Sequence, residues 1–135
     1  MANAIYPKWK ELALGLGVGS GTKPTGTLKL ALIDTGVYTY NAAHDYWDDA
    51  SAGVVGTPTA IDSPTYTNGT LDGADVTFTT VTGNTAEAVI VFLDTGSAAT
   101  SPLVCYMDTG VTGLPVTPNG GNINVTLNAS GIFSL

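Results

Sequence analysis

The chain has 135 residues and a formal net charge of −7, with four lysines, no arginine and eleven acidic residues. This length suits one domain that buries a single core, and a lone cysteine provides no disulfide framework. All lysines lie in the first 29 residues, which carry a net charge of +3, whereas the remaining 106 residues carry ten acids and no basic residue. Such an acidic body lacks the phosphate contacts that dominate nucleic-acid affinity, which argues against nucleic acid as a partner.

The first predicted element is a short amphipathic helix near the N-terminus. Apolar side chains recur there at three- and four-residue steps, at Tyr6, Trp9, Ala13 and Leu16, with charged residues between them. Pro7 suits the first turn of such a helix. The alternating glycines in GLGVGSG and the following TKPT then break the pattern and predict a flexible connection.

We therefore divide the chain into an N-terminal helical arm over residues 1–20, a glycine-rich tether over 21–26 and a single β domain over 27–135. An aromatic-rich helix on such a tether either packs back on the body or docks on a partner. The docking alternative assigns partner binding to the aromatic and cationic residues of the arm: Tyr6, Lys8, Trp9 and Lys10.

From residue 27 onward, the pattern changes to alternation or short apolar runs, which are typical of strands. We expect strands over 27–34, 74–81, 86–94, 102–108, 123–127 and 131–135, with a weaker one at 58–62 or 64–67. The two continuous apolar runs among them, AEAVIVFLD and PLVCYMD, are expected to be central. Six to eight short strands separated by Gly, Asn and Pro turns predict a mainly β chain, folded as an antiparallel β-sandwich or a related β fold.

Residues 40–50 predict one further helical turn, with Asn41 as its N-cap. The segment holds the only histidine, His44, next to Asp45, Asp48 and Asp49. Carboxylate oxygens are calcium ligands, but the spaced glycine and glutamate of a calcium loop are missing, so we interpret the cluster as a solvated helix end. We predict no metal site.

Aromatic residues surround this segment at Tyr38, Tyr40, Tyr46 and Trp47. They fit a sugar-stacking patch, although aromatic residues of a core or an interface are the commoner case.

The tripeptide Asp-Thr-Gly occurs three times, beginning at Asp34, Asp94 and Asp108, each time after an apolar run. It is the signature of aspartic proteases, which need two carboxylates about 3 Å apart that share a proton. If 87–94 and 103–108 form a hairpin, Asp94 and Asp108 lie about 20 Å apart and cannot form that pair. We interpret all three copies as turns, in which aspartate accepts a backbone hydrogen bond and glycine supplies a positive φ.

Other candidate chemistry is equally weak in this sequence. Cys105 lies in the apolar run PLVCYM and is expected to be a buried small hydrophobe. Asp72 and Asp75 are interpreted as turn formers, and GLGVGSG lacks the context of a phosphate loop. We therefore predict no enzyme activity, no catalytic residue and no cofactor.

The proportion of charged residues is 11%, against roughly 25% in an average soluble domain. Two alternatives account for this: a surface covered by copies of the chain or by other proteins, or a soluble β domain with a threonine-rich surface. The sequence shows neither a signal peptide nor a run of about 20 apolar residues, so we expect synthesis in the cytoplasm and no membrane partner.

Four stretches carry a resemblance to a known family: MANAIYPKWKE, YTYNAAHDYWDD, GADVTFTTVTGNTAEAVIVFLDTGSAATSPLV and GLPVTPNGGNINVTL. Through them, nearly the whole sequence resembles small structural proteins encoded in tailed-bacteriophage genomes. The resemblance implies a virion component, and more specifically a head decoration (cement) protein that binds and stabilises the major capsid shell. The implied partners are the major capsid protein or other virion proteins, and copies of the chain itself, with a trimer among the assemblies considered.

Two other functions remain open. The same fold could serve as a tail or head-fibre component of the particle. It could also be a carbohydrate-binding module displayed on the particle, with Trp47 as the residue to test.

Overall fold

The structure is a computed structural model that describes residues 3–17 and 25–134. Within these ranges the chain forms nine strands: β1 (Ala4–Ile5), β2 (Thr27–Ile33), β3 (Val54–Ala60), β4 (Thr70–Leu71), β5 (Val76–Phe78), β6 (Ala88–Asp94), β7 (Leu103–Met107), β8 (Ile123–Val125) and β9 (Phe133–Ser134). The α-helices of these ranges are α1 (Pro7–Gly17) and α2 (Trp47–Ala50), and the 3₁₀ helices are η1 (Ser51–Gly53), η2 (Thr67–Gly69) and η3 (Ala98–Thr100).

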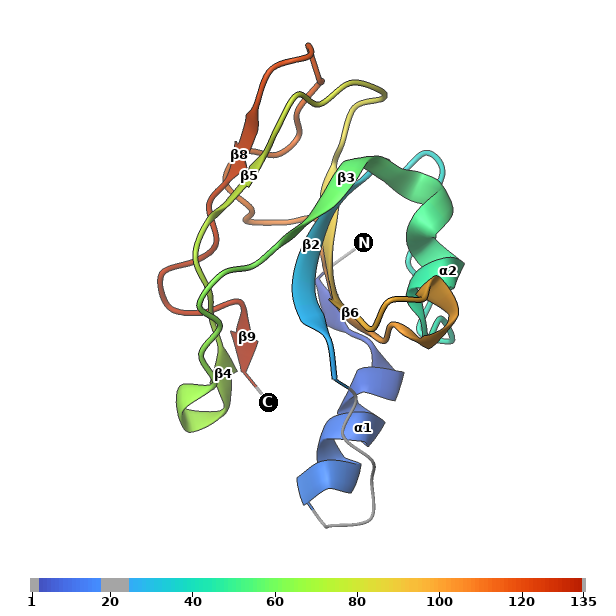
Figure 1. Cartoon of the computed structure of the whole chain (residues 1–135), viewed down its shortest axis with the longest axis vertical. Coiled ribbons are helices and arrows are strands. Elements are labelled where there is room, and N and C mark those ends of the chain that lie inside the picture. The colour runs from blue at the N-terminus through green and yellow to red at the C-terminus, as the bar shows by residue number, and fades with distance from the viewer. Residues whose placement is uncertain (1–2, 18–24, 135) are drawn as a thin grey trace.

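Five strands form an antiparallel sheet in the order β1-β7-β6-β2-β3. Strand β2 pairs with β6 along its whole length, from Thr27 opposite Asp94 to Ile33 opposite Ala88. Figure 1 shows β2 and β6 in the middle of the molecule, with α2 on one side and the two-stranded sheets β5–β8 and β4–β9 on the other. The prediction of a mainly β, antiparallel, sandwich-like fold is therefore confirmed.

Alternation of side chains along the strands places apolar residues on both faces of the central sheet. One face carries the aliphatic cluster, whose buried members are Leu30, Leu32, Val55, Ile61, Val76, Phe78, Val81, Ala86, Val89, Val91, Val104, Cys105, Ile123, Val125 and Leu127. The other face carries the aromatic cluster: Tyr6, Ala31, Ile33, Tyr38, Trp47, Ala50, Ala88, Ile90, Phe92, Leu103 and Tyr106. The β5–β8 sheet covers the first face, and the segment that contains α2 covers the second.

The strongly patterned strands β2, β6 and β7 lie where the sequence predicts them, and β5, β8 and β9 are shorter than predicted. Strand β3 begins at Val54, before the weak strand predicted at 58–62. The sequence pattern of β3 is interrupted by Gly56, whose φ is +71°, and by Pro58, two residue types that are uncommon inside strands. The two-residue strands β1 and β4 carry too little pattern to be predicted.

Helix α1 forms as predicted, with Pro7 in its first turn, and it continues through two of the glycines that were expected to end it. Residues 21–24 of the predicted tether, including Lys23, lie outside the described residues. The predicted helical turn over 40–50 is reduced to the four residues of α2. Asn41 does not cap α2, because its side-chain oxygen accepts a hydrogen bond from the Ala43 N–H (2.9 Å) in a separate turn.

Candidate functional site

The residues that precede α1 belong to the central sheet. Ala4 and Ile5 pair with β7, and the Tyr6 N–H donates to the Val104 carbonyl (3.0 Å). The side-chain oxygen of Asn3 accepts hydrogen bonds from the N–H groups of Asp108 (2.8 Å) and Thr109 (3.0 Å). The described part of the predicted arm therefore consists of an edge strand, which belongs to the body, and helix α1.

Tyr6 is a core residue and not a surface anchor. Its side chain is fully buried, and its hydroxyl group hydrogen-bonds to the Tyr38 hydroxyl (2.8 Å), which in turn contacts Nδ1 of His44 (3.0 Å). Burial raises the pKa of Tyr6, and the hydrogen bond with Tyr38 raises it further. The assignment of Tyr6 to partner binding does not fit this position, because the aromatic cluster already covers the ring.

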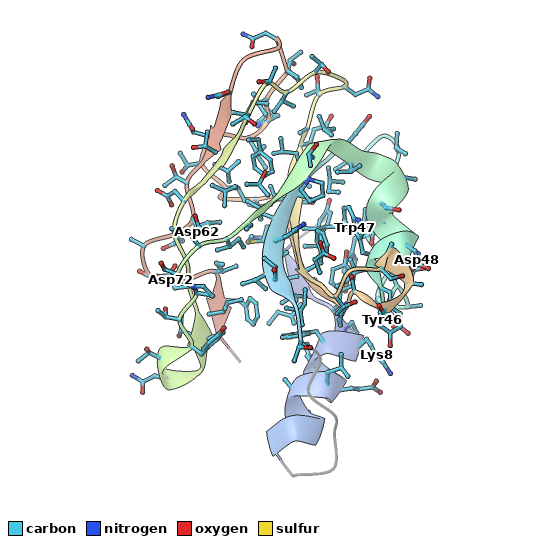
Figure 2. The ribbon with its side chains drawn as sticks, viewed as in Figure 1. Lys8, Tyr46, Trp47, Asp48, Asp62 and Asp72 are labelled. Atoms are coloured by element: carbon cyan, nitrogen blue, oxygen red, sulfur yellow. The ribbon has the colours of Figure 1, made fainter. Side chains whose placement is uncertain are left out.

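The cationic residues of α1 differ in their surroundings. Lys8 forms an ion pair with Glu11 one turn later (3.2 Å), and this neighbour raises the pKa of Lys8. Figure 2 shows Lys8 close to Tyr46, which belongs to the acidic segment that leads into α2. Lys10 is exposed.

The apolar residues of α1 also divide into two groups. Trp9 is partly buried and packs against the aliphatic cluster. Leu14 is 70% exposed and is one of three large hydrophobic residues that the described chain leaves open to solvent. Figure 1 shows α1 projecting from one end of the molecule. The exposed surface of α1 therefore combines Lys10 with Leu14, a residue that the periodicity of Tyr6, Trp9, Ala13 and Leu16 did not select.

The acidic residues around His44 support the local fold. The Asp49 carboxylate accepts hydrogen bonds from the N–H groups of Asp45 (2.9 Å) and Tyr46 (3.3 Å), and these bonds lower the pKa of Asp49. The carboxylate thus fixes the start of α2, whose first N–H, that of Trp47, donates to the Ser101 carbonyl. Among the described residues, no group of three or more His, Cys, Asp and Glu side chains is arranged to hold a metal ion.

The four aromatic residues of the predicted sugar-stacking patch do not form one surface. Trp47 is buried and stacks on Phe92, with ring centroids 4.2 Å apart and planes 1° from parallel. Tyr38 is buried in the hydrogen-bonded chain described above, and Tyr46 pairs through its backbone with Pro102. Tyr40 is half-buried and packs on Tyr6 and Tyr106.

Tyr40 lines a recess of about 450 Å³ at the end of the central sheet where β7 finishes. We call it the tyrosine recess; it is formed by Tyr38, Tyr40, Tyr106, Glu87 and Asp108, together with three threonines. The Tyr106 hydroxyl donates to Asp108 (3.1 Å), and burial, with this bond, raises the pKa of Tyr106 to about 12. Partial burial opposes ionisation of Asp108, but hydrogen bonds that include those from Thr109 and Tyr106 prevail, and the pKa of Asp108 is lowered.

Sequence reasoning missed Glu87, Tyr106 and Asp108 as members of a common site. They come from the start of one strand and the end of the next, and only the antiparallel pairing of β6 with β7 brings them together. Their position at strand ends beside an aromatic-rich segment was the one available signal.

Two of the three Asp-Thr-Gly copies are turns of the predicted kind. The Gly36 N–H donates to Asp34 (2.8 Å), and the Gly96 N–H donates to Asp94 (2.9 Å). A positive φ is found at Gly96 (+101°) and, in the third copy, at Gly110 (+73°), but not at Gly36, so that part of the prediction holds at two of the three glycines. The third copy differs, because Asp108 accepts from the Thr109 hydroxyl (3.0 Å) and the backbone N–H of Asp108 is bound by Asn3.

The hairpin assumed for the second and third copies is present in the structure. Val89 lies opposite Met107 and Phe92 opposite Leu103, so Asp94 and Asp108 follow opposite ends of this pair of strands. At about 3.3 Å per residue they are roughly 20 Å apart and cannot share a proton. Asp72 and Asp75 also bind backbone, accepting from the N–H groups of Gly73 and Leu127 (both 2.8 Å).

No protein-family model matches the sequence, and no curated protein is significantly similar to it. A search of the helices in residues 3–17 and 25–134 found none with the length and hydropathy of a membrane span.

Proposed function

We propose that the chain is a non-enzymatic structural protein of a bacteriophage particle, and specifically a decoration protein that binds the capsid shell through helix α1. The observation that carries this proposal is the projecting surface of α1. Leu14 is 70% exposed and Lys10 is exposed, on a helix that extends from the body. An exposed apolar side chain beside a cation suits a contact with an apolar pocket that has acidic neighbours.

The distribution of charge adds support. Residues 76–86 and 109–134, which include β5, β8 and β9, contain no charged side chain. Charged groups are depleted in the centres of protein interfaces, because their desolvation is costly. Long uncharged segments, together with the exposed cation Lys10 on α1, suit a position within a protein assembly. The resemblance to phage structural proteins points in the same direction.

Point substitutions on α1 test this function better than removal of residues 2–20. Such a deletion would also remove the core residue Tyr6 and strand β1. Leu14→Glu and Lys10→Glu change only exposed positions and should leave the fold intact. Tyr66→Ser is the matched control, since Tyr66 is 71% exposed in the segment before η2.

The measurement is the number of copies bound per particle after purified capsids are mixed with each variant. The Leu14→Glu, Lys10→Glu double variant should lose most of its binding, and Tyr66→Ser should bind like the natural chain. Full occupancy by the double variant would reject α1 as the docking element. No binding of the natural chain to capsids would reject the decoration role itself.

Copy number distinguishes the alternative of a tail or head-fibre component. A protein of the shell is present in many copies per particle, whereas a tail or connector part is present in few. Quantitative mass spectrometry of purified particles, referred to the major capsid protein, measures this ratio directly.

A further inference from the structure

We propose that the tyrosine recess binds a neutral sugar residue, with Tyr40 as the stacking platform and Glu87 as the acceptor for sugar hydroxyl groups. The recess lies where β7 ends, whereas α1 starts beside the other end of that strand, next to Val104. Sugar binding therefore does not depend on the docking function proposed for α1. The volume of the recess, about 450 Å³, lies within the usual range of small-molecule sites.

The aromatic wall is fixed in position by its neighbours. The centroid of the Tyr40 ring lies 5.1 Å from that of Tyr6 and 5.5 Å from that of Tyr106, and both neighbouring rings are buried. Tyr40 itself keeps part of its surface open at the recess. The electron-rich face of such a ring attracts the weakly positive C–H groups on one side of a pyranose. A ring held in place in advance loses little conformational entropy when a ligand binds.

The polar wall supplies acceptors and donors. One carboxylate oxygen of Glu87 accepts a hydrogen bond from the Thr35 N–H (3.0 Å), which positions the group at the recess. A carboxylate has about four acceptor sites, so Glu87 retains capacity for hydroxyl groups of a ligand. Hydrogen bonds to an ionised acceptor are roughly twice as strong as neutral ones. The hydroxyl group of Thr39, which also lines the recess, can both donate and accept, whereas that of Thr109 donates to Asp108 (3.0 Å) and can still accept.

This composition selects among ligand classes. Phosphates and carboxylates are repelled by the Glu87 carboxylate, and no lysine is found among the described residues that line the recess. An organic ammonium ion would pair with Glu87, but it offers no acceptor for the hydroxyl proton of Thr39. A sugar hydroxyl both donates and accepts, and a pyranose also has an apolar face for Tyr40. The neutral sugar is therefore the ligand class that uses both walls.

The test is titration of the full chain, followed by heteronuclear NMR. The probes are glucose, galactose, mannose, N-acetylglucosamine and short oligosaccharides of each, with tetramethylammonium as the cationic comparison. At least one saccharide should shift the amide signals of residues around the recess, saturably and in the millimolar range that suits a small open site. Tetramethylammonium should shift them less at equal concentration.

Two variants at the recess and one control assign the effect to its residues. Tyr40→Ala should weaken saccharide binding roughly tenfold, because it removes the stacking surface. Glu87→Gln keeps an oxygen for the Thr35 N–H but removes the charge, and should weaken binding several-fold with an unchanged amide spectrum elsewhere. Tyr66→Ala removes an exposed tyrosine far along the chain from the recess residues and should bind as the natural chain does.

Three results would overturn the proposal: no saccharide shifts the recess signals, tetramethylammonium binds more tightly than every saccharide, or the Glu87→Gln variant binds as tightly as the natural chain. Binding by the Glu87→Gln variant can be measured even if Tyr40→Ala fails to fold, because Glu87 is outside both buried clusters. None of these results bears on capsid docking by α1, which is tested by Leu14 and Lys10.

Discussion

The two faces of the central sheet are built from the same strands in different ways. On β2, Leu30 and Leu32 lie in the aliphatic cluster, and Ala31 and Ile33 lie in the aromatic cluster. The first cluster is closed by β5 and β8, whose apolar residues need no hydrogen-bond partners. The second contains three tyrosines and is closed by irregular segments before and after α2.

The two kinds of side chain differ in what they add beyond stability. Aliphatic side chains contribute by leaving water and by close packing, and neither effect favours a particular polar ligand. Tyrosines contribute apolar area in the same way, but each also brings a hydroxyl group that must find a partner. Those partners, Asp108 and His44 among them, bring polar groups to the aromatic face. The tyrosine recess opens beside this face.

The largest expected effect concerns the single thiol in the aliphatic cluster. Cys105 is 2% exposed, and burial raises the pKa of its thiol to about 12. At pH 8 the thiolate fraction is then roughly a thousandfold lower than for a free cysteine, and the reagent must also reach it. Labelling with a thiol reagent should proceed only through unfolding, and should become fast above the denaturation midpoint. Rapid labelling of the native chain would show that this face is not closed.

A core truncation on the same face should have the largest effect on folding free energy. Phe78 is 1% exposed, and Phe78→Ala should destabilise the chain by about 3–5 kcal/mol through lost burial and the cavity left behind. Denaturant unfolding, monitored by circular dichroism, measures this loss. If the variant remains folded, the NMR signals of the tyrosine recess should be unchanged, because Phe78 lies on the other face of the sheet. A collapse of those signals in a folded variant would mean that the two faces are coupled.

A smaller effect is expected for the hydrogen-bonded chain of the aromatic face. Tyr6→Phe keeps the ring but removes the hydroxyl that bonds to Tyr38 (2.8 Å), and should cost about 1 kcal/mol. Tyr66→Phe, at an exposed position, should cost almost nothing. Equal stabilities of the two variants would indicate that the tyrosine hydroxyl groups contribute nothing specific to this face.

The smallest expected effect is at the rim of the aromatic face, where Lys29 and Asp94 form an ion pair (2.7 Å). The hydrogen bond from Lys29 lowers the pKa of Asp94, and the bond from the Gly96 N–H lowers it further. A carboxyl group with a lowered folded-state pKa stabilises the fold above its unfolded pKa of about 3.9, and this contribution is lost as the pH falls through the folded value.

Because both side chains are partly exposed, the ion pair should contribute less than about 1 kcal/mol. Asp94→Asn keeps an acceptor for the turn and should change stability at pH 7 by no more than this amount. It should also flatten the dependence of stability on pH below about 4. An unchanged acid limb in this variant would assign the acid sensitivity to other carboxylates.

The elements with long apolar patterns were predictable, and the short ones were not. Strands β2, β6 and β7 have five to seven residues of apolar pattern, enough to fix both type and position. Asn41 was misassigned as a helix cap because aspartate or asparagine before a polar segment suits a turn equally well. The helix start depends instead on Asp49, whose carboxylate reaches back to the N–H groups of Asp45 and Tyr46.

The candidate sites were also predictable only in part. The sequence identified the N-terminal helix and its lysines, but it ranked Tyr6 with Trp9 because helical periodicity does not distinguish a residue that precedes the helix from one that lies on it. It grouped four aromatic residues by their closeness in sequence: Tyr38, Tyr40, Tyr46 and Trp47. In the structure, Trp47 stacks on Phe92, whereas Tyr40 lines a recess with Glu87 and Tyr106.

The sequence by itself determined the mainly β class, the two long apolar strands β6 and β7, the turns at Asp34 and Asp94, and the burial of Cys105. Each of these follows from local chemistry: side-chain alternation, the reach of an aspartate to the N–H two residues on, and the hydrophobicity of neighbours. Only the tertiary structure decided that Tyr6 is buried and that Glu87 and Asp108 meet Tyr40 at one recess. Those contacts join residues that are far apart in the chain. Their energies depend on distances between side chains, which are known only once the chain has folded.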